Sequence, residues 1–537
     1  MKKYLIIATL LLSLVGCSED FLDKEPLDII SSKAVFEDES LTEAYLYKLY
    51  DYLPSGYGDT GYGKEYLLSS IVDESRTKSG WIASNTTIVP GFISPTNNPI
   101  GIWGKSYEGI RRANNIVNSL EASSLDTNFK TRISAEARYL RAWLYFDLTR
   151  RYGDVPLITV VQNLEDDLLV SQTSRADIYT FIDTELDAIA ESVPLKSDIP
   201  SNEYGRINRE TVWALSSRAN LYARNYSKAA ASAKKVMNSP SGFTLNNNID
   251  ELFQSDRGDS EVIFEVLYAK PFKGHDFDRY NLPPSLRSDW GSQTNPVQEL
   301  VDDYEMAATG LPITDPASGY DPTQPFVGRD KRFYATIVYN GATLKGKEID
   351  IVYPDGEDAL LKSGLHTITG YYIKKYIDES LPFGPAFGDS KISWKEFRLG
   401  EILLNYAEAQ NEASGPDATV YEALNEVRMR AGLPNLPAGL SKSEMTERIR
   451  QERRVELAFE NHRYFDLIRW GIAEQVLHDK YFHGMKITRD GSGGLIYDPT
   501  FEVNNRPKQI FLPKHNLFPI PQGEIEKNSN LEQNPGY

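Results

Sequence analysis

The sequence predicts a mostly α-helical fold in which helix pairs stack side by side and carry long irregular loops and a few short strands. Apolar residues recur at helical spacing in stretches that are neighbours along the chain. Residues 54–101 and 239–391 are instead rich in Gly, Pro, Ser and Asn, and loops of this length are usually functional. Short β-prone runs occur at 262–267 and 334–339. We therefore expect one globular unit, a helical scaffold that displays two irregular segments.

The N-terminal half begins with a helical stretch at 41–53 and continues with a helix pair. Residues 103–120 and 129–151 form this pair, and the second helix has one broad apolar face. Ser174 is typical of an N-cap, with Asp177 three residues further on, so a helix is expected to run from there to about residue 192.

Further helix pairs are expected toward the C-terminus. Residues 209–238 indicate a helical hairpin, with small residues at the crossing and a Tyr-x-x-Ala after the turn, and loosely resemble a tetratricopeptide unit. A second pair is expected at 394–413 and 420–431, and a last long helix at 442–470, ending at Gly471.

The first residues predict export and lipid attachment. Residues 1–16 have two lysines and then an apolar run too short to span a bilayer, which is typical of a signal peptide. This segment ends in LVGC and resembles a bacterial lipobox, so Cys17, the only cysteine, is expected to carry the lipid. Residues 17–28 would form the tether. The acidic residues after Cys17 resemble an export signal for the outer face of the outer membrane.

The net charge of −18 disfavours a nucleic-acid partner, because phosphate backbones require clustered Lys and Arg. Loss of the two lysines in 1–16 would give −18 − 2 = −20. Acidic cargo is disfavoured on average for the same reason, although a local basic pocket remains open. The 32 Tyr, 22 Phe and 7 Trp suit a large core and also a sugar-binding surface.

No catalytic motif stands out, and we expect a binding protein that is not an enzyme. Residues 56–61 read GYGDTG and match the dinucleotide fingerprint, but a helical stretch precedes them and no βαβ pattern follows. His-Glu-x-x-His and Gly-x-Ser-x-Gly are absent from the sequence. A carboxylate pair for glycoside hydrolysis stays open, because such pairs have no fixed spacing. No cofactor is implied, and the question of a structural cation stays open.

Five segments resemble signatures of the SusD/RagB family, in the family's order along the whole chain. They are RAWLYFDL with RYGDVPL at 141–157, RLGEILLNYAEA at 398–409, LNEVR with AGLP at 424–434, ERRVELAFE with RYFDLIRWG at 452–471, and PIPQGEI with NPGY at 519–537. The resemblance implies two SusD-like regions, 29–238 and 239–537, with tetratricopeptide-like helices. It also implies an outer-membrane lipoprotein facing the cell exterior, which binds glycans as a lid on a SusC-like TonB-dependent transporter.

The signature residues themselves are interpreted as scaffold. Trp143, Phe459 and Phe465 fall at core-like helical positions. The charged signature residues Arg141, Arg453 and Glu456 are expected to form ion pairs that fix helix packing. These residues identify a fold and say nothing about cargo.

Glycan contacts are expected from the irregular segments. Trp81 and Trp290 lie in polar, Gly-flanked stretches, whereas the other five tryptophans belong to or begin helical patterns. A loop Trp can cover the C–H face of a sugar, and nearby polar groups can fix its hydroxyls. The candidate neighbours are Asp73, Glu74, Arg76, Asn85, Arg287 and Asp289. The alternative is that each Trp anchors its loop to the scaffold.

Three other functions remain open. The same lid role could serve peptide or another nutrient, the chain could be a surface glycosidase, or it could be a scaffold that binds no soluble ligand.

Overall fold

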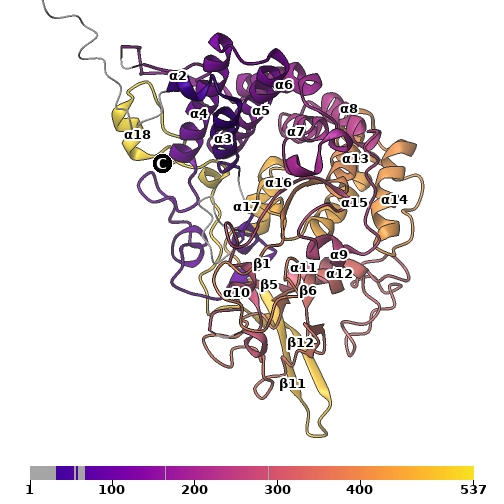
Figure 1. The fold of residues 1–537 in the computed structure, drawn as a ribbon. Helices are drawn as coiled ribbons and strands as arrows, with labels where there is room; N and C mark the ends of the chain where they lie inside the picture. The colour runs from indigo at the N-terminus through magenta and orange to yellow at the C-terminus, as the bar shows by residue number, and fades with distance from the viewer. Residues whose placement is uncertain (1–31, 54–55, 58–66, 164, 288) are drawn as a thin grey trace, which may run out of the picture.

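The computed structural model describes residues 32–53, 56–57, 67–163, 165–287 and 289–537. The predicted signal peptide, Cys17 and the tether 17–28 lie outside the described residues, as does most of the segment 56–61. Helices fill the upper part of Figure 1, and irregular chain with short strands fills the lower part. This confirms the mostly helical fold class.

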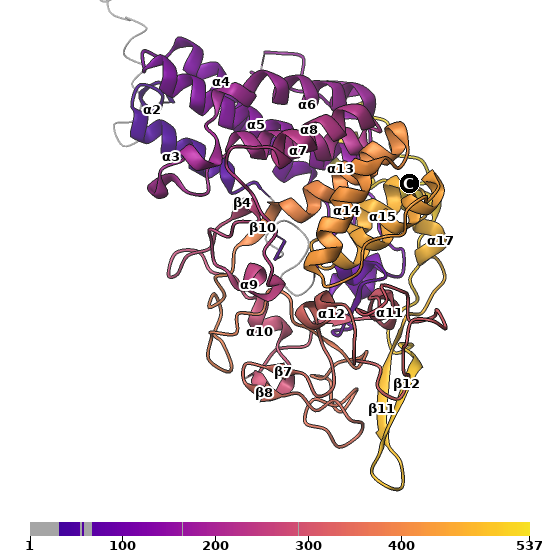
Figure 2. The ribbon, with the colours of Figure 1, turned by 90° about the vertical axis from the view of Figure 1, so that its right-hand side faces the viewer.

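The predicted helix pairs are present, and from α4 to α8 the helices stack in sequence order. α4 packs on α5, α5 on α6, α6 on α7 and α7 on α8, and α8 packs against α13 and so joins the N-terminal to the C-terminal helices (Figure 2). Their bounds are α3 (Glu39–Tyr50), α4 (Trp103–Ala122), α5 (Thr127–Tyr152), α6 (Arg175–Ile189), α7 (Arg209–Tyr222), α8 (Tyr226–Met237), α13 (Leu399–Ser414), α14 (Ala418–Arg430), α15 (Lys442–Glu456) and α16 (Arg463–Arg469).

Short helices and two-stranded antiparallel ladders make up much of the rest. The short helices are α2 (Ser32–Val35), α9 (Ile249–Gln254), α10 (Phe277–Asn281), α11 (Gln298–Asp303), α12 (Lys331–Thr336), α17 (Ala473–Leu477) and α18 (Gln522–Lys527). The ladders are β1 (Ser75–Thr77) with β5 (Thr294–Pro296), β2 (Val155–Pro156) with β3 (Gln172–Thr173), β4 (Val262–Val266) with β10 (Trp394–Arg398), β6 (Ile337–Val338) with β9 (Tyr372–Ile373), β7 (Thr343–Leu344) with β8 (Lys347–Glu348), and β11 (His483–Arg489) with β12 (Leu495–Glu502).

Helix starts follow the expected capping chemistry. The Ser174 hydroxyl accepts the backbone N–H of Asp177 at 3.2 Å, as predicted for α6. Ser441 and Glu444 form a capping box at the start of α15. These caps satisfy N–H groups that have no partner within the helix.

Three element boundaries differ from the prediction. The helix expected at 394–413 begins only at Leu399, because Trp394 lies in β10 and pairs with Val266 of a distant strand. The β-prone run 334–339 is the end of α12 followed by β6. The helix expected at 442–470 is broken into α15 and α16.

The break after α15 has an identifiable cause. Phe459 and Asn461 adopt φ values of +64° and +62°, which no α-helix accommodates. Buried cations bind the carbonyls at the end of α15, since Arg398 donates to the Glu456 carbonyl at 2.9 Å and Lys375 to that of Ala458 at 2.9 Å. The chain therefore turns at 457–462 and restarts as α16.

The predicted core and ion-pair residues are confirmed. Trp143, Phe459 and Phe465 are buried. Arg141 pairs with Glu185 at 2.7 Å, and Arg453 pairs with Asp466 at 3.1 Å. These contacts tie neighbouring helices of the stack to each other.

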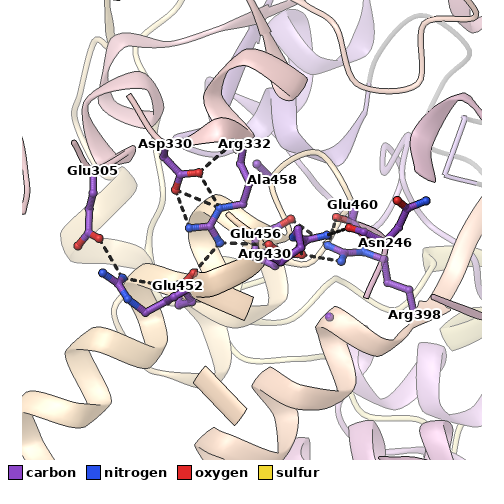
Figure 3. A network of polar contacts seen from close by, with 12 residues as sticks. Asn246, Glu305, Asp330, Arg332, Arg398, Arg430, Glu452, Glu456, Ala458 and Glu460 are labelled. Carbon is purple, nitrogen blue, oxygen red and sulfur yellow. Dashed lines mark hydrogen bonds and ion pairs between the residues drawn. The ribbon is translucent and has the colours of Figure 1, made fainter. Parts of the chain in front are cut away.

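Glu456 is the centre of a buried charge network (Figure 3). Its carboxylate lies 2.6 Å from Arg398 and 3.1 Å from Arg332, and it also pairs with Arg430. One turn earlier on α15, Glu452 lies 2.5 Å from Arg332. Burial alone would raise the pKa of Glu456, but the three guanidinium groups hold it well below its usual range. The network fastens α15 to α14, β10 and α12.

We predict that Glu456→Gln destabilises the protein by about 3–5 kcal/mol, because it leaves three buried arginines without their shared countercharge. Urea denaturation measures the change. Glu447→Gln is the matched control on the same helix, since its side chain is 71% exposed, and it should have little effect. Equal effects of the two substitutions would contradict the structural role of Glu456.

Candidate functional site

The candidate site is built on the ladder between β1 and β5. These strands are more than 200 residues apart in sequence, and they pair antiparallel with Thr77 opposite Thr294. The next backbone contact continues the ladder, because the Lys78 N–H donates to the Gln293 carbonyl at 3.0 Å. Trp81 follows Thr77 by four residues, and Trp290 precedes Thr294 by four residues. The ladder therefore brings both tryptophans to one end of the strand pair.

Trp81 and Trp290 form an exposed pair. Their ring centroids are 6.3 Å apart with an interplanar angle of 67°, which is an edge-to-face arrangement. Trp81 is 63% exposed and Trp290 is 37% exposed. The ring of the buried Tyr280 also lies near Trp290, with ring centroids 6.2 Å apart. The two tryptophans predicted to contact glycan thus lie together at the surface.

The loop that carries Trp290 is held by polar contacts. Asp289 pairs with Arg279 of α10, and its carboxylate accepts the backbone N–H of Trp290 at 2.6 Å. Arg287 donates to the Asp289 carbonyl. Arg287 is half-buried and Asp289 is exposed, so the structure places both predicted polar neighbours beside Trp290.

Asp73 and Arg76 have structural roles instead of the predicted direct glycan contact. Both side chains are buried. Asp73 receives two hydrogen bonds from Arg463, at 3.0 and 2.9 Å, and lies 2.7 Å from Arg454. Burial alone would raise the pKa of Asp73, but these arginines hold it well below its usual range. The Arg76 guanidinium lies 3.9 Å from the Phe482 ring centroid and donates to the Val72 carbonyl at 2.6 Å.

Asn85 and Glu74 are also buried, so neither offers a surface to a ligand. Asn85 donates to the carbonyls of Thr77 and Ser79, at 2.8 and 2.9 Å, and so shapes the loop that leads to Trp81. Among the described residues, Oε2 of Glu74 has no hydrogen-bond partner. Burial raises the pKa of Glu74 to about 8, so this group is mostly protonated at neutral pH.

Several residues of this surface were missed by the sequence analysis. Phe387 is 61% exposed, and the Arg279 guanidinium lies 3.9 Å from its ring centroid. The signal was available, because Phe387 lies between Ala386 and Gly388 in a Gly- and Pro-rich stretch like those around the two tryptophans. Lys78 and Arg506 were also missed. Arg506 donates to the Lys78 carbonyl, a contact that no local pattern could reveal.

Three further findings on the described part of the chain concern another cavity, metal binding and membrane-spanning helices. A separate cavity of about 310 Å³ is lined by residues that include Tyr47, Tyr204, Arg206 and Lys273. No described group of three or more His, Cys, Asp or Glu side chains could hold a metal ion. Within the same residues, no helix combines the length and apolar character needed to cross a membrane.

We predict that Glu74→Gln changes the pH dependence of stability. The folded-state pKa of Glu74 is raised from 4.5 to about 8, so its contribution is fully present below pH 4.5 and is lost as pH rises toward 8. Wild type should therefore lose stability relative to Glu74→Gln between pH 5 and 9, by the order of a few kcal/mol. Urea denaturation at both pH values tests this, with Glu447→Gln as the control. A difference that is constant with pH would contradict a protonated Glu74.

Comparison with known proteins identifies the family. The SusD family model matches residues 260–537, and a SusD-like model described as starch-binding and associating with the outer membrane matches residues 20–221. SusD-like protein P2 of Formosa agariphila is 26% identical and is aligned over 100% of both chains. The starch-binding protein SusD of Bacteroides thetaiotaomicron is 26% identical over 76% of this chain and 73% of its own.

Solved structures agree with the sequence relatives. A SusD-like carbohydrate binding protein of Bacteroides fragilis superposes with a TM-score of 0.80 at 28% identity, covering 93% of this chain and 100% of its own. Another SusD-like protein of the same species gives a TM-score of 0.80 at 27% identity, covering 96% of this chain and 100% of its own. Fold and sequence together show that the chain belongs to the SusD family.

Proposed function

We propose that this protein is a surface lipoprotein that captures oligo- or polysaccharide and delivers it to a SusC-like TonB-dependent transporter, without catalysing a reaction. The observation that supports glycan capture best is the exposed pair of Trp81 and Trp290. Two indoles at an angle offer apolar faces to the C–H groups of neighbouring sugars. Two of the SusD-like relatives are a starch-binding protein and a carbohydrate binding protein, which favours the same cargo class.

The size of this surface favours modest affinity. The exposed fractions of the two residues, 63% and 37%, together correspond to about one fully exposed tryptophan. A fully covered Trp hides ~150–250 Å², which at ~25 cal/mol per Å² corresponds to ~4–6 kcal/mol before ordering costs. We therefore expect dissociation constants of the order of micromolar to millimolar. A polysaccharide chain with repeated units would raise the apparent affinity through multivalency.

The proposed cellular location rests on the predicted signal peptide and on Cys17. Lipid on Cys17 would anchor the protein in the outer membrane, and residues 17–28 would hold the body off the surface. Exposure on the outer face would place the tryptophan pair where large glycans arrive. Transfer to a transporter is then the step that makes capture useful to the cell.

The alternative functions lead to different experimental results. A peptide-binding lid would need no sugar-stacking ring, and a glycosidase would generate new reducing ends from its substrate. Neither claim is supported by a particular contact of the described residues, whereas the tryptophan pair supports glycan binding.

We predict that Trp81→Ala and Trp290→Ala each abolish the retardation of the protein in affinity gel electrophoresis against the glycan it binds, because each removes one stacking face. The measurement uses residues 18–537 and a panel of plant, host and microbial polysaccharides, with circular dichroism as the folding check. Trp213→Ala is the matched control, since Trp213 is a partly exposed tryptophan on α7 in the helical layer.

The outcomes separate the site from the function. Retardation that persists in both site variants would keep glycan capture and overturn the assignment to this surface. Absence of retardation in every glycan would contradict glycan capture and favour another nutrient. Release of reducing ends would contradict the non-catalytic role.

A further inference from the structure

Three basic side chains from separate segments converge beside the tryptophan pair. Lys78 follows β1, Arg287 precedes Trp290, and Arg506 follows β12. This gathering differs from the rest of a chain whose net charge is −18. It therefore needs a local explanation.

The contacts of Arg506 and Lys78 hold them together. Arg506 donates to the Lys78 carbonyl and to the Asn505 carbonyl, the latter at 2.6 Å. A Cβ on Gly80 would lie 4.0 Å from the Arg506 guanidinium carbon, so this guanidinium borders the residue next to Trp81. Lys78 is only 4% exposed.

Arg287 belongs to the irregular segment that leads to β5. Its side chain packs over Gly291, where any Cβ would overlap it, and its guanidinium donates to the Asp289 carbonyl. In the described part of the chain, Nε of Arg287 and Nε of Arg506 are buried without a hydrogen-bond partner. These two Nε donors are themselves buried, so they show that the protein leaves both guanidinium groups incompletely paired beside the exposed aromatic pair.

No carboxylate among the described residues forms an ion pair with Lys78, Arg287 or Arg506. Two acids lie nearby without forming an ion pair with these groups: Asp289 pairs with Arg279, and Asp358 accepts the Ser285 N–H at 2.9 Å. Burial lowers the pKa of Arg287 and outweighs the charges of these two acids, which act to raise it. The neighbouring His366 bonds Ser363 and the Glu357 carbonyl, and burial lowers its pKa.

The close approach of like charges makes the protonated form of Lys78 less favourable. Burial lowers the pKa of Lys78 to about 8, and the positive charges of Arg287 and Arg506 act in the same direction. Buried charges are normally paired, as they are around Glu456 in this protein. An anion bound between these groups would supply the missing countercharge and would accept charge-assisted hydrogen bonds from the guanidinium groups.

We propose that the surface of Trp81 and Trp290 selects acidic glycans, with a carboxylate or sulfate of the sugar bound by Arg287 and Arg506. The buried Lys78 adds positive charge behind these two side chains. This inference rests on the proposed glycan capture at the same surface and names the class of glycan. The rings bind the sugar face, and the basic groups distinguish charged from neutral chains. The net negative charge of the body disfavours acidic polymers elsewhere, so the basic cluster confines them to this site.

The test uses pairs of polysaccharides that differ mainly in charge. Polygalacturonate is compared with its methyl ester, and a sulfated galactan, carrageenan, with neutral agarose. Arg287→Gln and Arg506→Gln remove one charge each, and Lys48→Gln on α3, whose side chain is 61% exposed, is the matched control. Retardation is normalised to the control variant in the same gel, which corrects for repulsion between the acidic protein and an acidic gel.

We expect retardation by at least one charged member and not by its neutral partner. Each Arg variant should weaken binding by about tenfold or more, the effect of losing a hydrogen bond to a charged group. Retardation by polygalacturonate alone would identify a carboxylate, and by carrageenan alone a sulfate. Lys78→Met, which removes the charge and keeps most of the length of the side chain, should act in the same direction.

Two results would overturn the inference and leave glycan capture intact. One is that charged and neutral partners retard the protein equally, or that only a neutral glycan retards it, while the retardation still depends on Trp81 and Trp290. The other is binding of a charged glycan that none of the basic variants weakens. Absence of binding to every glycan would instead overturn the proposed function, and this inference with it.

Discussion

Helix α15 holds the helical layer and the irregular layer together through buried charge, and the candidate site depends on this connection. Glu456 and Glu452 face buried arginines of α14, β10 and α12. Arg454, on the same helix, pairs with Asp73 just before β1. Removing one partner would leave an uncompensated buried charge, so these contacts tolerate little change in the position of either layer. The ladder that carries the tryptophans is thereby fixed to the scaffold.

This arrangement separates the parts that hold the site from the parts that can meet a ligand. Asp73, Arg76 and Asn85 bind protein groups and set the path of the chain around β1. Beyond the end of the ladder, Trp81 and Trp290 reach the surface with Arg287, Lys78 and Arg506 around them. Such a division lets a fold keep its scaffold while the exposed loop residues change.

The sequence predicted the scaffold well because its evidence is local. Helical periodicity and the Ser174 cap located α6, and the family signatures contain the buried Trp143 and Glu456. Long-range pairing was not predictable in this way. Trp394 lies in a strand because it pairs with Val266 of β4. Asp73 forms a buried ion pair with Arg454, which is 381 residues away in the sequence. The two loop tryptophans were singled out by their polar, Gly-flanked sequence, but three-residue strands such as β1 have too little pattern to show that they meet.

The most direct test of the account is a crystal structure of the protein with an oligosaccharide of the polymer that retards it most. We expect sugar rings against Trp81 and Trp290, with an acidic substituent within hydrogen-bond distance of Arg287 or Arg506. A sugar bound in the cavity lined by Tyr47 and Tyr204, with the tryptophan pair uncovered, would contradict the account.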